Sequence, residues 1–353
     1  MNICFVIPNM AGGGAERVIA NLSNYLSLNG HRNIILMTTN GEVAYELNKS
    51  IELVQLGNAT GGKLRERVRR ICDMRSFMKK HMDYSFVGME TSTNIYTLIA
   101  GIGLKTSIVV SERNDPQKYE ARRLRDIIYT LLGKGFIFQT TDAKHYFSRK
   151  IQKNAVVIPN PVNPNLPIVH CDIDSKVVVA VGRLDVQKNY PLLIRSFAKI
   201  IKEGIDAELH IYGKGPLLEE LSEIASVEGL EDKVVFKGFR SNVWHDIEKA
   251  SVYVLSSDYE GMPNALIEAM ALGLPVISTN CPIGGPSELI TSGENGILVP
   301  IGDEDLLAKA MVSILTNKDF AYRLGDSAVK VYEELSISSI AEKWTDFLRD
   351  KHE

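Results

Sequence analysis

The sequence predicts an α/β protein built from two doubly wound parallel-sheet domains that face each other across a central cleft. Three observations predict this class. Short β-branched runs alternate with helical patterns along the whole chain. These runs are continuously apolar, which is typical of parallel strands buried on both faces. A length of 353 residues also exceeds what one hydrophobic core usually holds.

The first half of the chain supplies the expected N-terminal domain, residues 1–162. Its strands are expected at residues 3–8, 33–39, 51–56, 85–89, 106–112, 135–140 and 155–160. The spacing of apolar residues predicts helices at residues 15–28, 63–84, 91–99, 117–132 and 142–148, with a further short helix between the second and third strands.

A proline-rich stretch separates the two domains. Four prolines fall between Pro159 and Pro167, and proline cannot donate to a strand ladder, so an extended linker is expected. The series then restarts as a second domain, residues 168–335. Its strands are expected at residues 176–183, 207–213, 233–239, 252–257, 275–280 and 296–300, and its helices at 190–202, 216–227, 243–250 and 263–271, with more helices toward the C-terminus.

The composition excludes several classes of protein. The four cysteines stand far apart without histidines at ligand spacing, so neither a disulfide framework nor a zinc site is expected. No uncharged apolar run is long enough to span a membrane. The first ten residues lack a basic start and a cleavage site, so no secretory signal is expected.

Charge is distributed unevenly between the two halves. Residues 1–160 hold 22 Lys and Arg against 13 Asp and Glu, whereas the remainder holds 18 against 30. Much of the basic excess lies in residues 63–84, where apolar residues recur at helical spacing among Arg and Lys. This segment is either a surface helix packed on a sheet or a helix that also contacts an anionic membrane or a phosphate-bearing acceptor.

Three consecutive glycines, Gly12 to Gly14, separate the first strand from a helix. Such a loop lets a phosphate or a sugar hydroxyl approach backbone amides at a helix N-terminus; a tight turn without a ligand is the alternative. The glycines do not fit G-x-G-x-x-G, and no acidic residue ends the second strand. Both facts argue against a dinucleotide-dependent dehydrogenase.

Two cations follow the first strand of the second domain. Arg183 and Lys188 lie in "VGRLDVQKN", at the carboxyl end of an expected strand, where ligands of such sheets bind. An Arg fork and a Lys point charge can together clamp a diphosphate, although solvated surface charges remain the alternative. The "IYGKGP" turn after the next strand either lines a nucleotide pocket or is a plain turn.

The stretch "DYEGMPNALIEAM" is predicted to form a loop and a helix, with Glu260 in the loop and Glu268 about one turn inside the helix. The amides of Gly261 to Ala265 would point at a bound anion, helped by the helix dipole. Two carboxylates eight positions apart can hold hydroxyl-rich groups on either side of that anion. The pattern therefore predicts a nucleotide-sugar site.

These motifs resemble those of the retaining glycosyltransferases of family 4, which have the GT-B fold of two Rossmann-like domains. The resemblance covers nearly the whole chain, because "GGGAER", "GRLDVQKN", "EGMPNALIE", "CPIGGPSELI" and "ENGILVP" occur in that order. It implies that residues 336–353 form a helix that crosses back to the N-terminal domain. That segment has an N-cap serine and apolar side chains on one face, Ile340, Trp344, Phe347 and Leu348.

The resemblance also implies roles for the motif residues. Arg183 and Lys188 would bind the donor diphosphate and stabilise the charge that grows on it, so that no metal is required. Glu260 would hold the donor sugar and Glu268 the ribose; Glu260, Arg183 and Lys188 are the catalytic candidates. Further donor contacts are expected from Gly13, Gly14, Gly213, Phe239, Arg240, Gly261, Met262, Pro263, Asn264 and Ala265.

One position departs from the family pattern. Family members often carry a His after the fifth strand of the first domain, where "VVSERNDP" offers Glu112, Arg113 and Asn114 as acceptor-side candidates. In the front-face mechanism inferred for the family, a donor phosphate oxygen takes the acceptor proton, so no separate protein base is required. The D-x-D of Asp172 to Asp174 lies in the linker and is expected to be solvated charge, not a metal site.

The predicted function is that of a retaining, metal-independent glycosyltransferase. It would move a hexose or N-acetylhexosamine from a UDP-sugar to a growing, lipid-linked surface glycan, in the cytoplasm or at the inner face of the cell membrane. No cofactor and no nucleic-acid partner are expected. A glycosyltransferase acting on a soluble sugar acceptor and a non-catalytic nucleotide-sugar-binding partner subunit stay open as alternatives.

Overall fold

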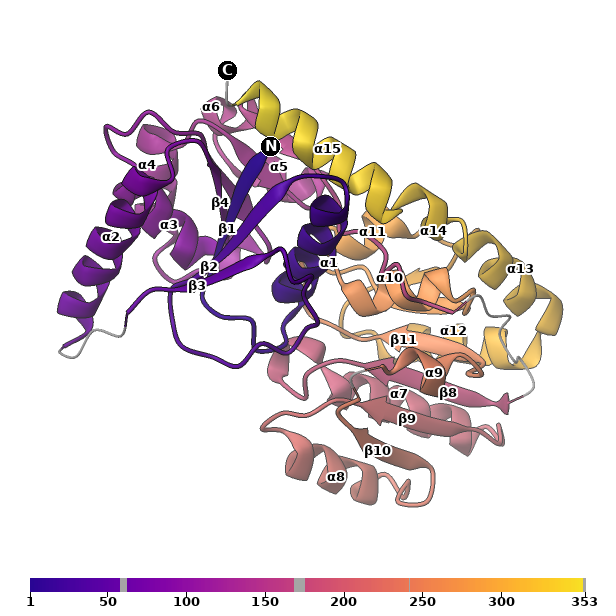
Figure 1. Cartoon of the computed structure of the whole chain (residues 1–353). Coiled ribbons are helices and arrows are strands. Elements are labelled where there is room, and N and C mark those ends of the chain that lie inside the picture. Colours follow the sequence, from indigo (N-terminus) through magenta and orange to yellow (C-terminus); the bar gives the residue numbers. More distant parts are fainter. Residues whose placement is uncertain (58–61, 168–174, 241, 352–353) are drawn as a thin grey trace. The chain divides into compact units, whose positions relative to one another are not determined.

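The computed structural model describes residues 1–57, 62–167, 175–240 and 242–351. These residues form two compact units, Met1–Pro161 with Ile337–Glu353 and Val162–Ser336. Each unit contains one sheet in which every strand pair is parallel (Figure 1). The two doubly wound parallel sheets predicted from the sequence are therefore confirmed.

The first unit has a seven-stranded sheet in the order β3-β2-β1-β4-β5-β6-β7. Its strands are β1 (Asn2–Ile7), β2 (Arg32–Met37), β3 (Glu52–Gln55), β4 (Ser85–Met89), β5 (Ile108–Glu112), β6 (Phe136–Phe138) and β7 (Ala155–Val157). Its helices are α1 (Gly14–Leu28), α2 (Lys63–Lys80), α3 (Thr91–Ala100), η1 (Pro116–Lys118), α4 (Arg122–Leu132), α5 (Thr141–Tyr146), α6 (Arg149–Gln152) and α15 (Ile337–Asp350).

The prediction of a short helix between the second and third strands is wrong. Residues 39–50 form an irregular segment instead. Asn24 of α1 holds this segment, because its side chain accepts from the Asn48 N–H at 2.7 Å and donates to the Glu46 carbonyl at 2.9 Å. These bonds satisfy backbone groups that a helix would otherwise pair internally.

Different helices cover the two faces of the first sheet. On one face, Cys4 of β1 shares a buried cluster with Met74 and Met78 of α2. Phe5 points to the opposite face, since successive strand residues alternate. There it meets Trp344 of α15 edge-to-face, with ring centroids 6.0 Å apart, and Figure 1 shows α15 running beside α1. Burial on both faces explains why β1 is continuously apolar.

The second unit repeats this plan with a six-stranded sheet in the order β10-β9-β8-β11-β12-β13. Its strands are β8 (Val177–Val181), β9 (Glu208–Tyr212), β10 (Val234–Gly238), β11 (Val252–Leu255), β12 (Val276–Thr279) and β13 (Ile297–Val299). Its helices are η3 (Val186–Lys188), α7 (Tyr190–Lys202), α8 (Leu218–Val227), α9 (Trp244–Ile247), α10 (Asn264–Ala271), α11 (Gly285–Leu289), α12 (Glu304–Thr316), α13 (Lys318–Ala328) and α14 (Val331–Glu334).

The basic helix predicted at residues 63–84 is α2, which ends at Lys80. Its C-terminal half packs on the sheet through Met74 and Met78, which are fully buried. Its N-terminal half does not, because Leu64 and Val68 are exposed. Among the described residues, no helix is both long and apolar enough to cross a membrane.

We predict that Trp344→Ala destabilises the first unit by about 3–5 kcal/mol, because the indole is completely buried against Phe5 and its removal leaves a cavity. Thermal unfolding followed by near-ultraviolet circular dichroism will measure the change. Lys343→Ala, at an exposed position of the same helix, is the matched control and should leave the midpoint unchanged. Equal midpoints for the Trp344 variant and the wild type would contradict the prediction.

Candidate functional site

The loops that follow β8 and β11 meet at the carboxyl edge of the second sheet, the edge at which parallel sheets bind ligands. They meet because β8 and β11 are neighbouring strands. Ser256 donates its hydroxyl to the Lys188 carbonyl at 2.8 Å, and the Asn189 side chain donates to Asp258 Oδ1 at 2.7 Å. These hydrogen bonds hold the two loops in one position relative to each other.

Lys188 and Glu260, which are far apart in the sequence, form an ion pair in these loops. Lys188 Nζ lies 2.6 Å from Glu260 Oε1, and only 14% and 8% of the two side chains are exposed. The carboxylate also accepts from Ser257 Oγ at 2.6 Å and from Gln187 Nε2 at 3.3 Å. A buried carboxylate is costly unless a cation and hydrogen bonds compensate its lost hydration, and here both are present.

Gln187 belongs to this site, although the sequence analysis did not single it out. Its side-chain amide donates to the Tyr259 carbonyl at 2.9 Å as well as to Glu260, and its Oε1 accepts from Arg183 Nη2 at 3.4 Å. Gln187 therefore positions Arg183 relative to Glu260. Its position next to Lys188 in the sequence places it near the site. A glutamine in a loop does not by itself indicate that its side chain bridges two other residues.

Arg183 differs from Lys188 in its exposure. Its side chain is 73% exposed, and its Nη2 lies 3.2 Å from Asp185 Oδ2. An exposed ion pair of this kind contributes little stability, so the guanidinium can exchange Asp185 for a phosphate at small cost. The edge of the sheet thus carries two different cations. Lys188 is buried and paired with Glu260, whereas Arg183 is accessible to solvent.

The loop after β11 leads directly into α10. Helix α10 starts at Asn264, and its N-cap residue is Pro263, whose side chain makes no capping hydrogen bond. Gly261, Asn264 and Ala265 are half-buried, whereas Met262, Pro263 and Glu268 are buried. The start of α11 packs against this loop so tightly that a Cβ on Gly285 would lie 1.9 Å from the Gly261 carbonyl oxygen. The predicted strand, loop and helix are present.

The turn after β9 packs against the loop that carries Arg183. A Cβ on Gly213 would lie 1.8 Å from the Gly182 carbonyl oxygen, so glycine alone fits there. Lys214 places its Nζ 5.1 Å from the centroid of the Phe239 ring. The Phe239 ring is 57% exposed and Arg240 is exposed as well, which leaves both side chains accessible to a ligand.

In the first unit, the three-glycine loop joins β1 to α1. Gly12 has a φ of +117°, which favours glycine, and Gly13 is the N-cap of α1. The Glu16 carboxylate folds back over this turn, since a Cβ on Gly13 would lie 2.2 Å from its Oε2. A carboxylate therefore already lies at the helix N-terminus where an anion was expected. A phosphate would have to displace it from Gly13 and Gly14.

Glu112, one of the three acceptor-side candidates, is buried at the end of β5. It accepts hydrogen bonds from Thr91 Oγ1 at 2.8 Å, Asn94 Nδ2 at 3.3 Å and the Tyr129 hydroxyl. Burial raises the pKa of the Glu112 carboxyl, while Arg125 and these hydrogen bonds oppose the rise. Glu112 therefore connects α3 and α4 to β5 through its buried carboxylate.

The neighbouring candidates are more accessible. The Arg113 guanidinium donates to the Asn160 side chain, which also accepts from Gln139 Nε2 at 2.7 Å. Burial lowers the pKa of Arg113 to about 9, and Glu90 opposes that shift. Asn114 is exposed. Both Arg113 and Asn114 stay candidates for contacts with an acceptor.

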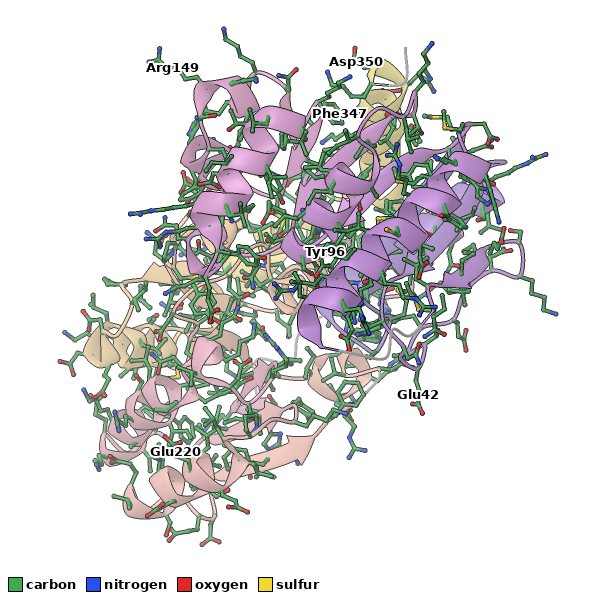
Figure 2. All side chains as sticks on the ribbon, turned by 90° about the vertical axis from the view of Figure 1, so that its left-hand side faces the viewer. Glu42, Tyr96, Arg149, Glu220, Phe347 and Asp350 are labelled. Atoms are coloured by element: carbon green, nitrogen blue, oxygen red, sulfur yellow. The ribbon has the colours of Figure 1, made fainter. Side chains whose placement is uncertain are left out.

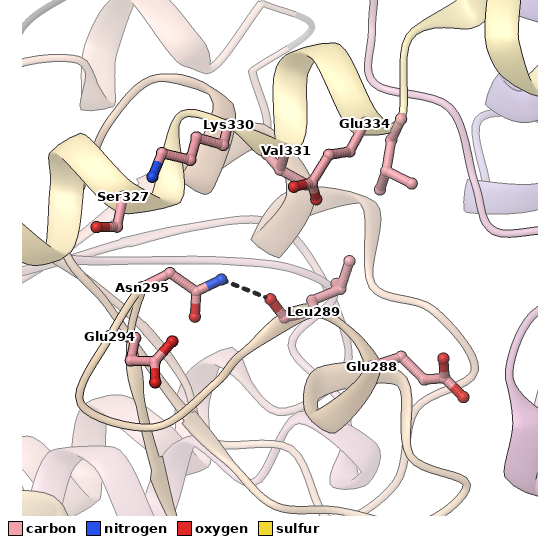
Figure 3. Close-up of a pocket in the computed structure, with 9 residues that line it drawn as sticks. Glu288, Leu289, Glu294, Asn295, Ser327, Lys330, Val331 and Glu334 are labelled. Carbon is pink, nitrogen blue, oxygen red and sulfur yellow. Dashed lines mark hydrogen bonds between the residues drawn. The ribbon is translucent and has the colours of Figure 1, made fainter.

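A cavity of about 210 Å³ in the second unit is lined by residues other than Arg183, Lys188 and Glu260. Figure 3 shows its lining from α11, α13 and α14, with the Asn295 amide donating to the Leu289 carbonyl at 3.0 Å. Its side chains include three glutamates and Lys330 and offer no arrangement specific to a nucleotide. The predicted solvated D-x-D of Asp172 to Asp174 lies outside the described residues.

Comparison with known proteins agrees with this geometry. Residues 170–331 match the sequence model of the family described as "Glycosyl transferases group 1". The chain is 29% identical over 354 residues to the Campylobacter jejuni GalNAc-alpha-(1->4)-GalNAc-alpha-(1->3)-diNAcBac-PP-undecaprenol alpha-1,4-N-acetyl-D-galactosaminyltransferase, covering 98% of this chain and 97% of that protein. It is 26% identical to a second Campylobacter jejuni enzyme, N-acetylgalactosamine-N,N'-diacetylbacillosaminyl-diphospho-undecaprenol 4-alpha-N-acetylgalactosaminyltransferase, over 96% and 97% of the two chains.

Solved structures show the same fold. The Anabaena protein HepE in complex with UDP and glucose superposes with a TM-score of 0.87 at 18% identity, over 99% of this chain and all of HepE. TarM from S. aureus, in complex with UDP and other ligands, gives a TM-score of 0.83 at 14% identity, over 98% and 99% of the two chains. The resemblance to a known family that the motifs indicated is confirmed: residues 170–331 match the model of the group 1 glycosyl transferases, and the chain is a glycosyltransferase with the GT-B fold.

Proposed function

We propose that this protein is a retaining, metal-independent glycosyltransferase that moves a hexose or N-acetylhexosamine from a UDP-sugar to a growing, lipid-linked surface glycan at the inner face of the cell membrane. One observation carries the donor half of the proposal. The exposed Arg183 and the paired Lys188 and Glu260 share the carboxyl edge of the second sheet with the N-terminal end of α10.

Charge and hydrogen bonding at this edge suit a sugar diphosphate. The Arg183 fork can bind one phosphate in bidentate geometry. Lys188 and the α10 amides add positive potential beside it. As the sugar leaves, negative charge grows on the diphosphate, and fixed positive groups stabilise that charge without reorganisation. This role for the two cations supports a reaction that needs no metal, with a donor phosphate oxygen taking the acceptor proton.

Glu260 and Glu268 are proposed to hold the sugar and the ribose. The Glu260 carboxylate keeps about one acceptor site beyond its bonds to Lys188, Ser257 and Gln187, since a carboxylate has about four such sites. A sugar hydroxyl can therefore donate to it while the ion pair stays intact. Phe239 and Arg240 would border the base, and Gly13 and Gly14 would approach the phosphates after Glu16 moves away.

The acceptor is proposed from the relatives. Both Campylobacter jejuni enzymes are named for transfer to a diphospho-undecaprenol-linked saccharide, and they cover nearly all of this chain. Arg113 and Asn114 are the proposed contacts with the acceptor in the first unit. A soluble acceptor is the second candidate, because sucrose-phosphate synthase from Thermosynechococcus elongatus has the same fold, with a TM-score of 0.83.

We predict that UDP at 100 times its Kd stabilises the wild type by about 2.7 kcal/mol and that Arg183→Ala removes most of this gain. Thermal-shift measurements against UDP and GDP, free and as their common sugar conjugates, will test this. Arg323→Ala, at an exposed position of α13, is the control and should retain the full shift. A GDP-specific shift would overturn the choice of UDP, and an unchanged shift in the Arg183 variant would overturn the diphosphate clamp.

We also predict that Lys188→Met lowers the stability of the second unit by about 3 kcal/mol, because it leaves the Glu260 carboxylate buried without its cation. Adding Glu260→Gln to this variant should restore part of the loss, since the uncompensated charge is then removed. Urea unfolding of the two single variants and the double variant will measure the coupling. Lys199→Met, which removes a half-buried cation paired with Glu304 and Asp305, is the control. Additive losses would contradict the pairing.

For the reaction itself, we predict that a chelator leaves turnover unchanged and that the new bond keeps the α configuration of the donor. A synthetic polyprenyl-diphosphate-linked saccharide and free disaccharides are the acceptors to compare, with NMR of the product to assign the anomer. Loss of activity in the chelator would contradict the metal-independent mechanism. Turnover of the soluble sugars alone would favour the second candidate. Donor binding without transfer to any acceptor would favour a non-catalytic subunit.

A further inference from the structure

Helix α4 carries its apolar residues on the side opposite to the one expected for a helix packed on a sheet. Arg125 and Tyr129 point inward and are completely buried. Leu124, Ile127 and Leu131 are spaced so that they share one face, and they are exposed at 57%, 56% and 72%. An apolar stripe that faces solvent along a whole helix requires an explanation.

The inward side of α4 is occupied by a polar network. The Arg125 guanidinium donates to the Pro116 carbonyl and to Asp126 Oδ1, both at 2.8 Å, and lies 4.8 Å from the centroid of the Phe147 ring. Tyr129 donates its hydroxyl to Glu112. These bonds satisfy a buried cation and a buried carboxylate, and they fix which side of α4 faces the sheet. The bonds of Arg125 and Tyr129 therefore keep Leu124, Ile127 and Leu131 on the solvent side of α4.

The N-terminal half of α2 adds a second apolar stripe to the same region. Leu64 and Val68 are one turn apart and are exposed at 76% and 53%. Helix α3 contacts both α2 and α4. Figure 2 presents the side of the first unit on which these three helices lie, with Tyr96 of α3 labelled near its centre. The two stripes thus belong to one side of the unit.

Arginines surround both stripes. Arg65, Arg67 and Arg69 are exposed on α2, and Arg122 and Arg123 are exposed at the start of α4. Tyr119, which precedes α4, lies close enough to α2 for Arg67 to act on it electrostatically. Burial raises the pKa of Tyr119, and the nearby Arg67 guanidinium opposes this rise. The N-terminal ends of α2 and α4 also lie at the carboxyl edge of the first sheet, because helices in such units run antiparallel to the strands.

We propose that this side of the first unit, defined by Leu64 and Val68 of α2 and by Leu124, Ile127 and Leu131 of α4 with the five flanking arginines, binds an anionic lipid bilayer. Apolar side chains interleaved with arginines are typical of a helix that lies in a membrane interface. Basic residues add attraction for anionic headgroups. The apolar side chains would enter the acyl boundary while the arginines stay with the headgroups.

This membrane-binding surface extends the proposed function. It rests on that proposal for the lipid-linked nature of the acceptor. A unit bound in this way would present its carboxyl edge, with Arg113 and Asn114, close to the headgroups. A diphosphate-linked saccharide would be available at that level. Binding to the bilayer itself requires no donor and no acceptor, so it can be tested separately from catalysis.

The test is co-sedimentation of the full chain with sucrose-loaded vesicles, in pure phosphatidylcholine and in a mixture containing phosphatidylglycerol. The wild type should bind the mixed vesicles at least tenfold better than the neutral ones, and added salt should release it. The triple variant Leu124→Ser, Ile127→Ser, Leu131→Ser and the double variant Arg122→Gln, Arg123→Gln should each lose at least tenfold. All five positions are exposed, so the fold should persist. Leu28→Ser with Val227→Ser, also exposed apolar positions, is the matched control and should bind as the wild type does.

Three results would overturn the proposal: no vesicle binding by the wild type, equal binding by the variants, or binding that salt does not affect. Concentration-dependent dimerisation that the triple variant abolishes, without vesicle binding, would assign the surface to a second copy of this chain. The UDP thermal shift, measured on the same samples, keeps the two proposals apart. A normal shift without vesicle binding removes the membrane surface alone, and vesicle binding without any shift removes the donor site alone.

Discussion

The direction of parallel strands is the constraint on which the rest of this structure depends. Strands that all run the same way place the loops after their carboxyl ends on a single edge. In the second unit this rule brings together residues that are more than 70 positions apart, such as Lys188 and Glu260. The same rule in the first unit places Arg113 and the three-glycine loop at one edge. Each candidate site residue is therefore positioned by the sheet before any contact between side chains is considered.

Much of the fold could be predicted from the sequence because parallel strands that are buried on both faces appear as continuous apolar runs. β1, β4 and α7 appear where continuous apolar runs and helical spacing placed them. The prediction failed where side chains and not periodicity decide the structure. Asn24 holds residues 39–50 in an irregular segment through hydrogen bonds with Glu46 and Asn48. Such contacts are long-range, so no local pattern carries them.

The candidate site likewise has a part that the sequence predicts and a part that it does not. Arg183, Lys188, Glu260 and Glu268 could be selected because charged residues near a strand end and a helix start have few structural explanations. The contact of Lys188 with Glu260 could not, and neither could the bridge that Gln187 makes between loops. The position of the Glu16 carboxylate over Gly13 could not be predicted from the sequence either. A pattern identifies which groups are available, whereas their partners depend on how the loops pack.

The return of α15 to the first unit has a consequence for how the protein is made. Phe5 is translated at the start of the chain, but Trp344, which covers it, leaves the ribosome only after the whole second unit. At about 5–20 residues per second, synthesis from Phe5 to Trp344 takes roughly 17–68 s. The second unit is continuous in sequence and can fold during this time. The first-made unit therefore finishes last, and its uncovered sheet face is the part of the nascent chain for which a chaperone would be needed.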